Sequence, residues 1–141
     1  MNKTKITRED ISRRFKEANC LDLQKIHVQM GELQNIGACH LNARQGIETG
    51  EYPFAIKVIL MAPTGLLRVH WVNRTLDDKY IDDTLGYMCY DRTYFLMQEY
   101  DISQLKGTNM ETIQTEVKND FIKQLYTPEE LETMEFDLLD L

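Results

Sequence analysis

Two stretches in the middle of the chain have the hydrophobic pattern of β-strands. Residues 54–61 are apolar and often β-branched at nearly every position, which is typical of a strand covered on both faces. Residues 66–72 instead alternate between apolar and polar side chains, as in a strand with one face in a core. Residues 62–65 supply Pro and Gly at positions that suit a tight turn. The pattern predicts a β-hairpin.

A second hairpin is expected further along the chain. Residues 85–90 and 94–100 are rich in Tyr, Phe and Met, and Asp91-Arg92-Thr93 separates them. A helix through Met88, Phe95 and Met97 is the alternative interpretation of the same apolar positions. The polar residues 77–83 predict a surface connection between the two hairpins.

Helices are predicted near both ends. Thr7 is a good N-cap, and apolar positions four apart follow it, which predicts a helix over about 7–19. Thr108 and Glu111 form a capping-box pattern before apolar residues at steps of four, which predicts a helix from about 109 to 126. The Thr127-Pro128-Glu129-Glu130 sequence predicts the start of a short terminal helix.

The segment between the first helix and the first hairpin is ambiguous. Residues 21–30 fit either a strand or a helix, and the spacing of Leu23, Ile26 and Met30 favours a helix. Residues 31–50 contain four glycines among Asn and Gln, which indicates loops around at most one short strand.

This order of elements predicts an α+β fold with an N-terminal helix or helices, a central antiparallel sheet of two hairpins and two C-terminal helices. A length of 141 residues suits one domain, so we expect residues 1–141 to form a single domain. Within it we expect a basic N-terminal helix at about 7–19, a sheet region at about 52–105 and an acidic helical tail at about 109–141.

Composition narrows the protein class. The longest apolar run, residues 55–62, is far shorter than the roughly 20 residues of a transmembrane helix, so membrane insertion is not expected. No signal peptide follows the basic N-terminal residues, and the three cysteines show no disulfide or metal spacing. A cytoplasmic location is therefore expected.

The charge is distributed unevenly along the chain. The net charge is −7, and residues 101–141 hold 10 acidic residues against 3 basic ones. Six carboxylates of the tail follow one another without a Lys or Arg, and these are Glu129, Glu130, Glu132, Glu135, Asp137 and Asp140. Such a surface favours a basic partner.

Tyrosines provide a second candidate contact surface. Tyr87, Tyr90 and Tyr94 lie in a stretch whose only basic residue is Arg92. Because a nucleic-acid-binding sheet interleaves its aromatics with Lys and Arg, this composition favours protein binding. Direct nucleic-acid binding through the basic front helix is the less favoured reading, since acidic residues are interspersed there.

The leading hypothesis from sequence is a non-enzymatic protein-binding module, such as an adaptor, an immunity-type protein or an inhibitor. It would use its acidic C-terminal surface and Tyr-rich sheet against a basic partner, of which a nucleic-acid-binding enzyme is a special case. No catalytic residue, metal ligand or cofactor is assigned, and the oligomeric state stays open. The predicted partner-binding residues are Glu129, Glu130, Glu132, Glu135, Asp137, Tyr87, Tyr90 and Tyr94.

The alternative hypothesis is a small enzyme without a familiar motif, or a ligand- or metal-binding domain, around Cys39, His40 and His70. A thiol and an imidazole are the groups of a Cys–His nucleophile and also bind metals. Adjacent side chains of an extended segment point to opposite faces, so His40 could act on Cys39 only if the chain turns there. A zinc site that adds Cys89 lacks the short paired spacing of structural zinc sites.

Overall fold

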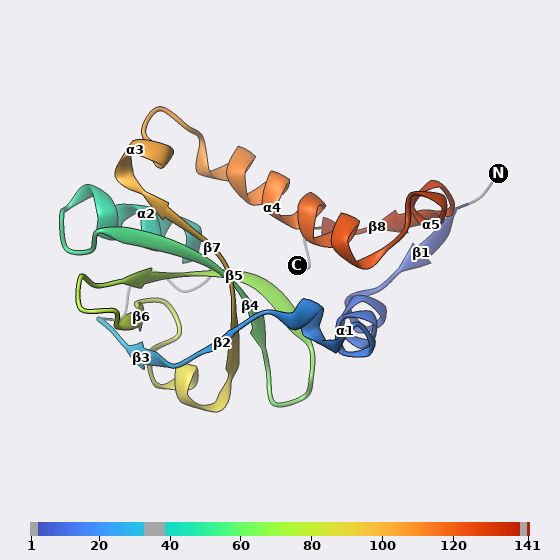
Figure 1. The fold of residues 1–141 in the computed structure, drawn as a ribbon, viewed down its shortest axis with the longest axis horizontal. Helices are drawn as coiled ribbons and strands as arrows, with labels where there is room; N and C mark the ends of the chain where they lie inside the picture. The colour runs from blue at the N-terminus through green and yellow to red at the C-terminus, as the bar shows by residue number, and fades with distance from the viewer. Residues whose placement is uncertain (1–2, 33–38, 139–140) are drawn as a thin grey trace.

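A six-stranded sheet forms the centre of the protein, as the computed structural model of residues 3–32, 39–138 and 141 shows (Figure 1). The strand order is β2-β7-β4-β5-β6-β3, and every neighbouring pair is antiparallel except β3 with β6. The strands are β2 (Lys25–Ile26), β3 (Val28–Met30), β4 (Phe54–Met61), β5 (Leu67–Arg74), β6 (Tyr80–Asp82) and β7 (Thr93–Asp101). The predicted α+β class is confirmed.

Helices cover one face of the sheet. The α-helices are α1 (Arg8–Glu17), α2 (Cys39–Glu48), α3 (Ile102–Leu105), α4 (Met110–Leu125) and α5 (Pro128–Thr133). Helices α1, α2 and α4 bury their apolar sides against β4, β5 and β7, with Phe15, Trp71 and Phe121 almost fully buried. None of the described helices is long and apolar enough to cross a bilayer.

A smaller core lies on the opposite face of the sheet. It contains Val58, Val72 and Tyr94 from the central strands together with Val28 and Cys89. Cys89 belongs to η2 (Gly86–Asp91), a 3₁₀ helix that packs over this face. Because side chains alternate along a strand, β4 contributes to both cores, which explains why its sequence is apolar at successive positions.

The first predicted hairpin is confirmed, and the second is wrong. β4 pairs with β5 over its whole length, from Phe54 opposite Arg74 to Met61 opposite Leu67. Residues 86–91, however, form η2, and β7 pairs with the other edge of β4 and with β2. The backbone N–H and C=O groups on both edges of β4 need hydrogen-bond partners. β5 supplies them on one edge and β7, which is distant in sequence, supplies them on the other. The alternative of a helix through Phe95 and Met97 is also wrong.

The prediction for residues 31–50 needs correction, because Cys39–Glu48 is the helix α2. Its buried side includes Gly46 and Asn42 beside Ala43 and Ile47. Glycine and asparagine are typical of loops, which is why the sequence pattern predicted a loop here. Residues 33–38 lie outside the described part of the chain.

The helix favoured for residues 21–30 is also wrong. The 3₁₀ turn η1 (Asn19–Asp22) follows α1, and its four residues all have positive φ, between 52° and 56°. L-residues rarely continue a helix from such a backbone. The chain therefore turns there and enters the short strands β2 and β3, which accounts for the mixed hydrophobic pattern.

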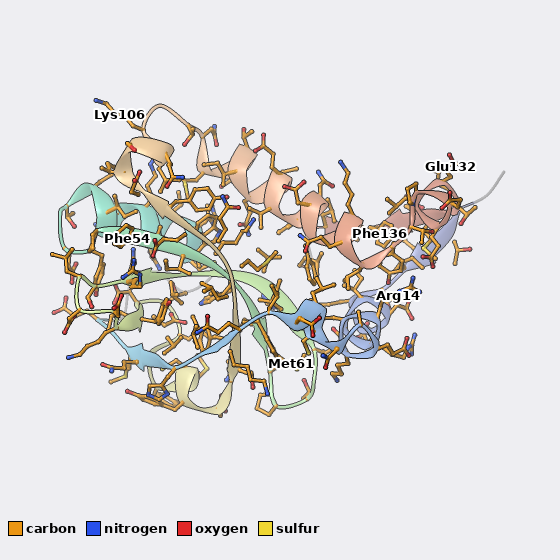
Figure 2. All side chains as sticks on the ribbon, viewed as in Figure 1. Arg14, Phe54, Met61, Lys106, Glu132 and Phe136 are labelled. Carbon is orange, nitrogen blue, oxygen red and sulfur yellow. The ribbon has the colours of Figure 1, made fainter. Side chains whose placement is uncertain are left out.

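The C-terminal tail is docked on the domain. Helix α5 starts at Pro128 as predicted, with the Thr127–Glu130 capping box, but the chain then forms the strand β8 (Met134–Phe136) within the tail that was predicted to be helical. β8 pairs in parallel with β1 (Thr4–Ile6), so these two strands, far apart in the sequence, lie side by side (Figure 1). Phe136 also packs against Tyr126, with ring centroids 5.1 Å apart, and the guanidinium of Arg14 lies over the same Tyr126 ring; Figure 2 labels Phe136 and Arg14.

Candidate functional site

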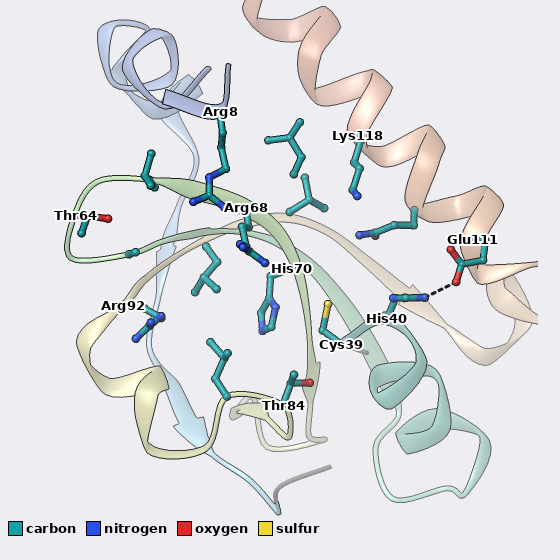
Figure 3. Close-up of a pocket in the computed structure, with 17 residues that line it drawn as sticks. Arg8, Cys39, His40, Thr64, Arg68, His70, Thr84, Arg92, Glu111 and Lys118 are labelled. Carbon is teal, nitrogen blue, oxygen red and sulfur yellow. Dashed lines mark hydrogen bonds and ion pairs between the residues drawn. The ribbon is translucent and has the colours of Figure 1, made fainter. Parts of the chain in front are cut away.

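A pocket opens along the edge of β5 that does not face β4, where the backbone N–H groups of Leu67 and Val69 donate to Ser12 and Leu141. β6 pairs with β5 only at Asn73 and Arg74, so among the described residues no strand covers the edge of β5 before them. The cavity there has a volume of about 510 Å³ and is lined by residues of α1, β5, α2, α4 and the segment around η2 (Figure 3). That volume is typical of a site for a small ligand or a piece of a larger one.

Helix α2 places Cys39 at this edge. The helix approaches the sheet closely because Gly46 has no side chain, and a Cβ there would lie 2.7 Å from the ring of Tyr52. Asn73 of β5 fixes the contact, since its amide donates to the carbonyls of Ala43 at 2.9 Å and Phe54 at 3.1 Å. Cys39, the first described residue of α2, therefore faces the pocket and the neighbouring His70 (Figure 3).

His70 of β5 is oriented by Asp82 at the end of β6. The His70 Nε2 and Asp82 Oδ2 atoms are 2.8 Å apart, and the two residues are 5% and 0% exposed. Tyr94 donates its hydroxyl to the same carboxylate oxygen at 2.6 Å, and the backbone N–H groups of Thr84 and Leu85 donate to Oδ1 at 2.8 and 2.9 Å. Four partners therefore hold one carboxylate in one orientation.

These contacts keep both groups charged in spite of their burial. Burial alone would raise the pKa of Asp82, but the His70 imidazole and the other donors lower it to about 2. Burial alone would lower the pKa of His70, but Asp82 and Cys39 raise it to about 9. At neutral pH the pair is therefore an imidazolium against a carboxylate.

The Cys39 thiol is strongly acidic for a cysteine. Burial would raise its pKa, but hydrogen bonding with His40 and His70, and with the backbone N–H of Trp71, lowers the pKa to about 6. Because Asp82 occupies Nε2 of His70, it is Nδ1 that remains for Cys39. Between about pH 6 and pH 9 the arrangement is a thiolate–imidazolium pair.

His40 flanks the thiol from the other side. The sequence argument against contact between Cys39 and His40 assumed an extended segment, whereas both residues lie in the first turn of α2. Hydrogen bonding with Cys39 raises the pKa of His40, against the effect of burial, and Glu111 of α4 adds to the rise. The His40 Nε2 and Glu111 Oε1 atoms are 2.8 Å apart (Figure 3).

The structure thus brings Cys39, His40 and His70 together, but sequence inspection missed Asp82. In the sequence Asp82 lies within the polar residues 77–83, which predict a surface connection. The signal that distinguishes Asp82 is its place directly after Tyr80-Ile81, a dipeptide typical of a strand.

The predicted partner-binding residues lie in several places. Tyr94 is 1% exposed and belongs to the buried network around Asp82, whereas Tyr87 and Tyr90 are 77% and 61% exposed on η2. In the tail, Glu130 forms an ion pair with Arg14 at 2.6 Å. The remaining described tail carboxylates are exposed, and these are Glu129, Glu132, Glu135 and Asp137, while Asp140 lies outside the described residues.

Of the four residues considered for a zinc site, Cys89 lies apart from Cys39, His40 and His70. Cys89 is buried in the core beneath η2, where its Sγ contacts the carbonyl of Val28. Within the described ranges, no group of three or more His, Cys, Asp or Glu side chains is arranged to hold a metal ion.

In the site, the Cys39 thiol therefore contacts the His70 imidazole, and the imidazole contacts the Asp82 carboxylate. The cavity opens next to the thiol. Comparison of the chain with protein-family models, with curated proteins and with solved structures finds no match.

Proposed function

We propose that the protein is a thiol-dependent acyl-transfer enzyme, with Cys39 as the nucleophile, His70 as the general acid and base, and Asp82 as the residue that orients His70. The observation that carries this proposal is the connected arrangement of Cys39, His70 and Asp82 at the edge of an open cavity. Nucleophile, base and orienting carboxylate in contact are the parts that covalent acyl transfer requires. This is the enzyme alternative from sequence, in preference to the binding module.

The reaction would proceed through a thioester. The Cys39 thiolate attacks the carbonyl carbon of an ester, thioester or amide, and the tetrahedral intermediate expels its leaving group, which takes the proton of the His70 imidazolium. Water or another nucleophile then attacks the thioester and gives its proton to His70. The acyl product leaves, and the thiolate–imidazolium pair is restored.

A donor for the developing oxyanion is available in the cavity. Gln114 of α4 lines the cavity, and its Oε1 accepts a hydrogen bond from Nε1 of Trp71 at 2.6 Å. Because that bond fixes the oxygen, the amide NH₂ group of Gln114 is the part left to donate to a substrate.

The first experiment measures the alkylation of Cys39 by iodoacetamide near pH 6, with peptide mass spectrometry as the readout. At that pH a thiol with a pKa of about 6 is about half ionised, whereas an ordinary thiol is about 0.1% ionised. Lower basicity reduces the reactivity of each thiolate by about 20-fold, so Cys39 should react about 20 times faster than an unperturbed thiol. Cys20 of the same chain, which is partly exposed, serves as the internal reference.

Variants then test the role of His70. His70→Ala should slow the alkylation of Cys39 severalfold, since His40 and Trp71 still stabilise the thiolate, whereas His27→Ala, a change at an exposed histidine, should leave the rate unchanged. A p-nitrophenyl acetate reaction should add one acetyl group to Cys39 in the wild type and none in Cys39→Ala. An alkylation rate for Cys39 that follows a pKa near 9 and ignores His70→Ala would overturn the proposal.

A protein-binding role of the acidic surface is compatible with this activity and stays a separate proposal. It is supported by Glu129, Glu132 and Glu135, which are exposed and form no ion pair within the part of the chain that the structure describes. Reversing these three charges should abolish retention of a basic partner in a pull-down and leave the alkylation rate of Cys39 unchanged. If the charge-reversed variant retains the basic partner as well as the wild type does, the acidic surface has no role in protein binding.

A further inference from the structure

We infer that the cavity binds an anionic group of the acyl substrate, a carboxylate or a phosphate, through Arg68, Lys118 and Arg8. This inference rests on the proposed acyl transfer at Cys39 and names the substrate class for it. The three side chains come from three different elements, β5, α4 and α1, and all line the cavity that contains Cys39.

The charge of the cavity is opposite to that of the protein. Its lining includes four Arg or Lys side chains and one carboxylate, in a chain whose net charge is −7. The single carboxylate, Glu111, is engaged with His40. A concave surface of one sign concentrates ligands of the other sign, so the local charge decides what enters the cavity even though the whole protein is acidic.

The three basic side chains line one cavity, and none of them is held in a close ion pair with another described residue. Figure 3 shows Arg8 and Arg68 on one side of this cavity and Lys118 on the side of α4. Among residues 3–32, 39–138 and 141, none of the three forms an ion pair. Burial lowers the pKa of Lys118, the negative charges of Cys39, Glu111 and Asp137 oppose this, and the like charge of Arg68 adds to the lowering. Gathering like charges is unfavourable, and an anion held between them removes that cost.

Arg92 provides a contrast within the same lining. Its guanidinium is held by Asp91 and by the carbonyl of Met88, so its charge is already used in the local structure of η2. Arg68, Lys118 and Arg8 lack such contacts among the described residues, which is why we assign the anion to them.

The position of Arg68 sets the distance of the anion from the reacting carbonyl. Arg68 and His70 are two residues apart on β5 and therefore project from the same face, about 6 to 7 Å apart along the strand. An anion on Arg68 would thus be separated from the carbonyl at Cys39 by only a few bonds. The substrate class is a short acyl compound with a carboxylate or phosphate near its scissile bond.

The experiment compares two alkylating reagents of similar size, neutral iodoacetamide and anionic iodoacetate, at Cys39 in the full chain at low ionic strength. Wild type should favour iodoacetate, and the ratio of the two rates should fall about fivefold or more in Arg68→Gln and in Lys118→Gln. Lys123→Gln, which removes an exposed lysine from the same helix, should leave the ratio unchanged. The iodoacetamide rate reports that the variants keep the reactive thiol.

A protection assay then separates the two sources of negative charge. Succinate and inorganic phosphate are each tested for slowing the alkylation of Cys39 by iodoacetamide, and the one that protects identifies the anion. Protection should be lost in Arg68→Gln and kept in Lys123→Gln.

The outcomes distinguish this inference from the proposed function. An equal preference for both reagents and no protection, with Cys39 still reacting fast, would overturn the anion site and leave acyl transfer standing. A wild-type Cys39 that reacts slowly with both reagents would instead overturn the proposed function.

Discussion

The Nε2 atom of His70 and the Oδ2 atom of Asp82 lie 2.8 Å apart in the interior of the protein, between the strands β5 and β6. This contact decides which nitrogen of the imidazole faces the thiol, because it leaves Nδ1 for Cys39. It also keeps the imidazole protonated, since a buried carboxylate beside it favours the charged ring.

Asp82→Asn should remove both effects. The variant should lower the alkylation rate of Cys39 at about pH 6 severalfold, since one of the groups that stabilise the thiolate, the His70 imidazolium, is lost while His40 remains. Tyr94→Phe removes one hydrogen bond from the same carboxylate and should have a smaller effect in the same direction. Equal rates in wild type and Asp82→Asn would mean that His70 does not need the carboxylate.

The same substitution should change stability in a pH-dependent way. The pKa of Asp82 is about 2 in the folded protein against 3.8 for an unperturbed carboxyl, so its stabilisation is present above about pH 4 and is lost as the pH falls toward 2. The pKa difference corresponds to roughly 2 kcal/mol of unfolding free energy. Urea unfolding of wild type and Asp82→Asn should therefore give curves that converge between pH 4 and pH 2.

The rate of acyl transfer should follow a bell-shaped pH profile. Activity should rise through about pH 6 as Cys39 ionises and fall through about pH 9 as His70 loses its proton. The alkylation of Cys39 by iodoacetamide, which needs no proton donor, should show the rise near pH 6 and no equivalent fall. A single rise near pH 9 in both assays would contradict the thiolate–imidazolium pair.

Gly46→Val should disturb the site from a distance. A Cβ at this position would lie 2.7 Å from the ring of Tyr52 and 3.1 Å from the side chain of Asn73, so α2 must move away from the sheet. Overpacking of this kind costs about 1 to 3 kcal/mol, and the shift should also slow the alkylation of Cys39. Gln45→Val, at the exposed neighbouring position, is the matched control for helix propensity and should change neither quantity by as much.

The contact between Arg14 and Glu130 should hold the tail in place. Arg14 donates to Glu130 at 2.6 Å and to the carbonyl of Leu125 at 3.0 Å, and it stacks on Tyr126. Because both charged side chains are partly exposed, Glu130→Gln should lower stability by at most about 1 kcal/mol. Arg14→Ala should cost more, since it also removes the stacking and the carbonyl contact. Thermal unfolding compares the two, and equal losses would show that only the ion pair matters.

The parts of the fold that could be predicted are those with strong local signals. The periodicity of residues 109–126 and the capping residue Thr7 identified α4 and α1, and the alternation in residues 66–72 identified β5. α2 escaped because its buried face uses Gly46 and Asn42, whose roles depend on the neighbouring strand. The pairing of β7 with β4 is a long-range choice that no local pattern encodes.

The candidate site shows the same division. Cys39, His40 and His70 could be named from their chemistry, because thiols and imidazoles are rare and reactive. Their partner Asp82 could not, since an aspartate in a polar stretch resembles any solvated turn until the strand order brings β6 beside β5. Tyr94 was assigned to a surface for the same reason, although its hydroxyl is buried against Asp82.

The pairing of β1 with β8 has a consequence for the timing of folding. Thr4 lies opposite Met134, so some 130 residues must be synthesised before this small sheet can close. β1 leads directly into α1, which carries Arg8 to the cavity. A ribosome-bound chain that already contains Cys39, His70 and Asp82 therefore still lacks the last anchor of its cavity wall. The reactive thiol would form before its surroundings are complete, and full selectivity would arise only once residues 134–136 have left the ribosome and paired with β1.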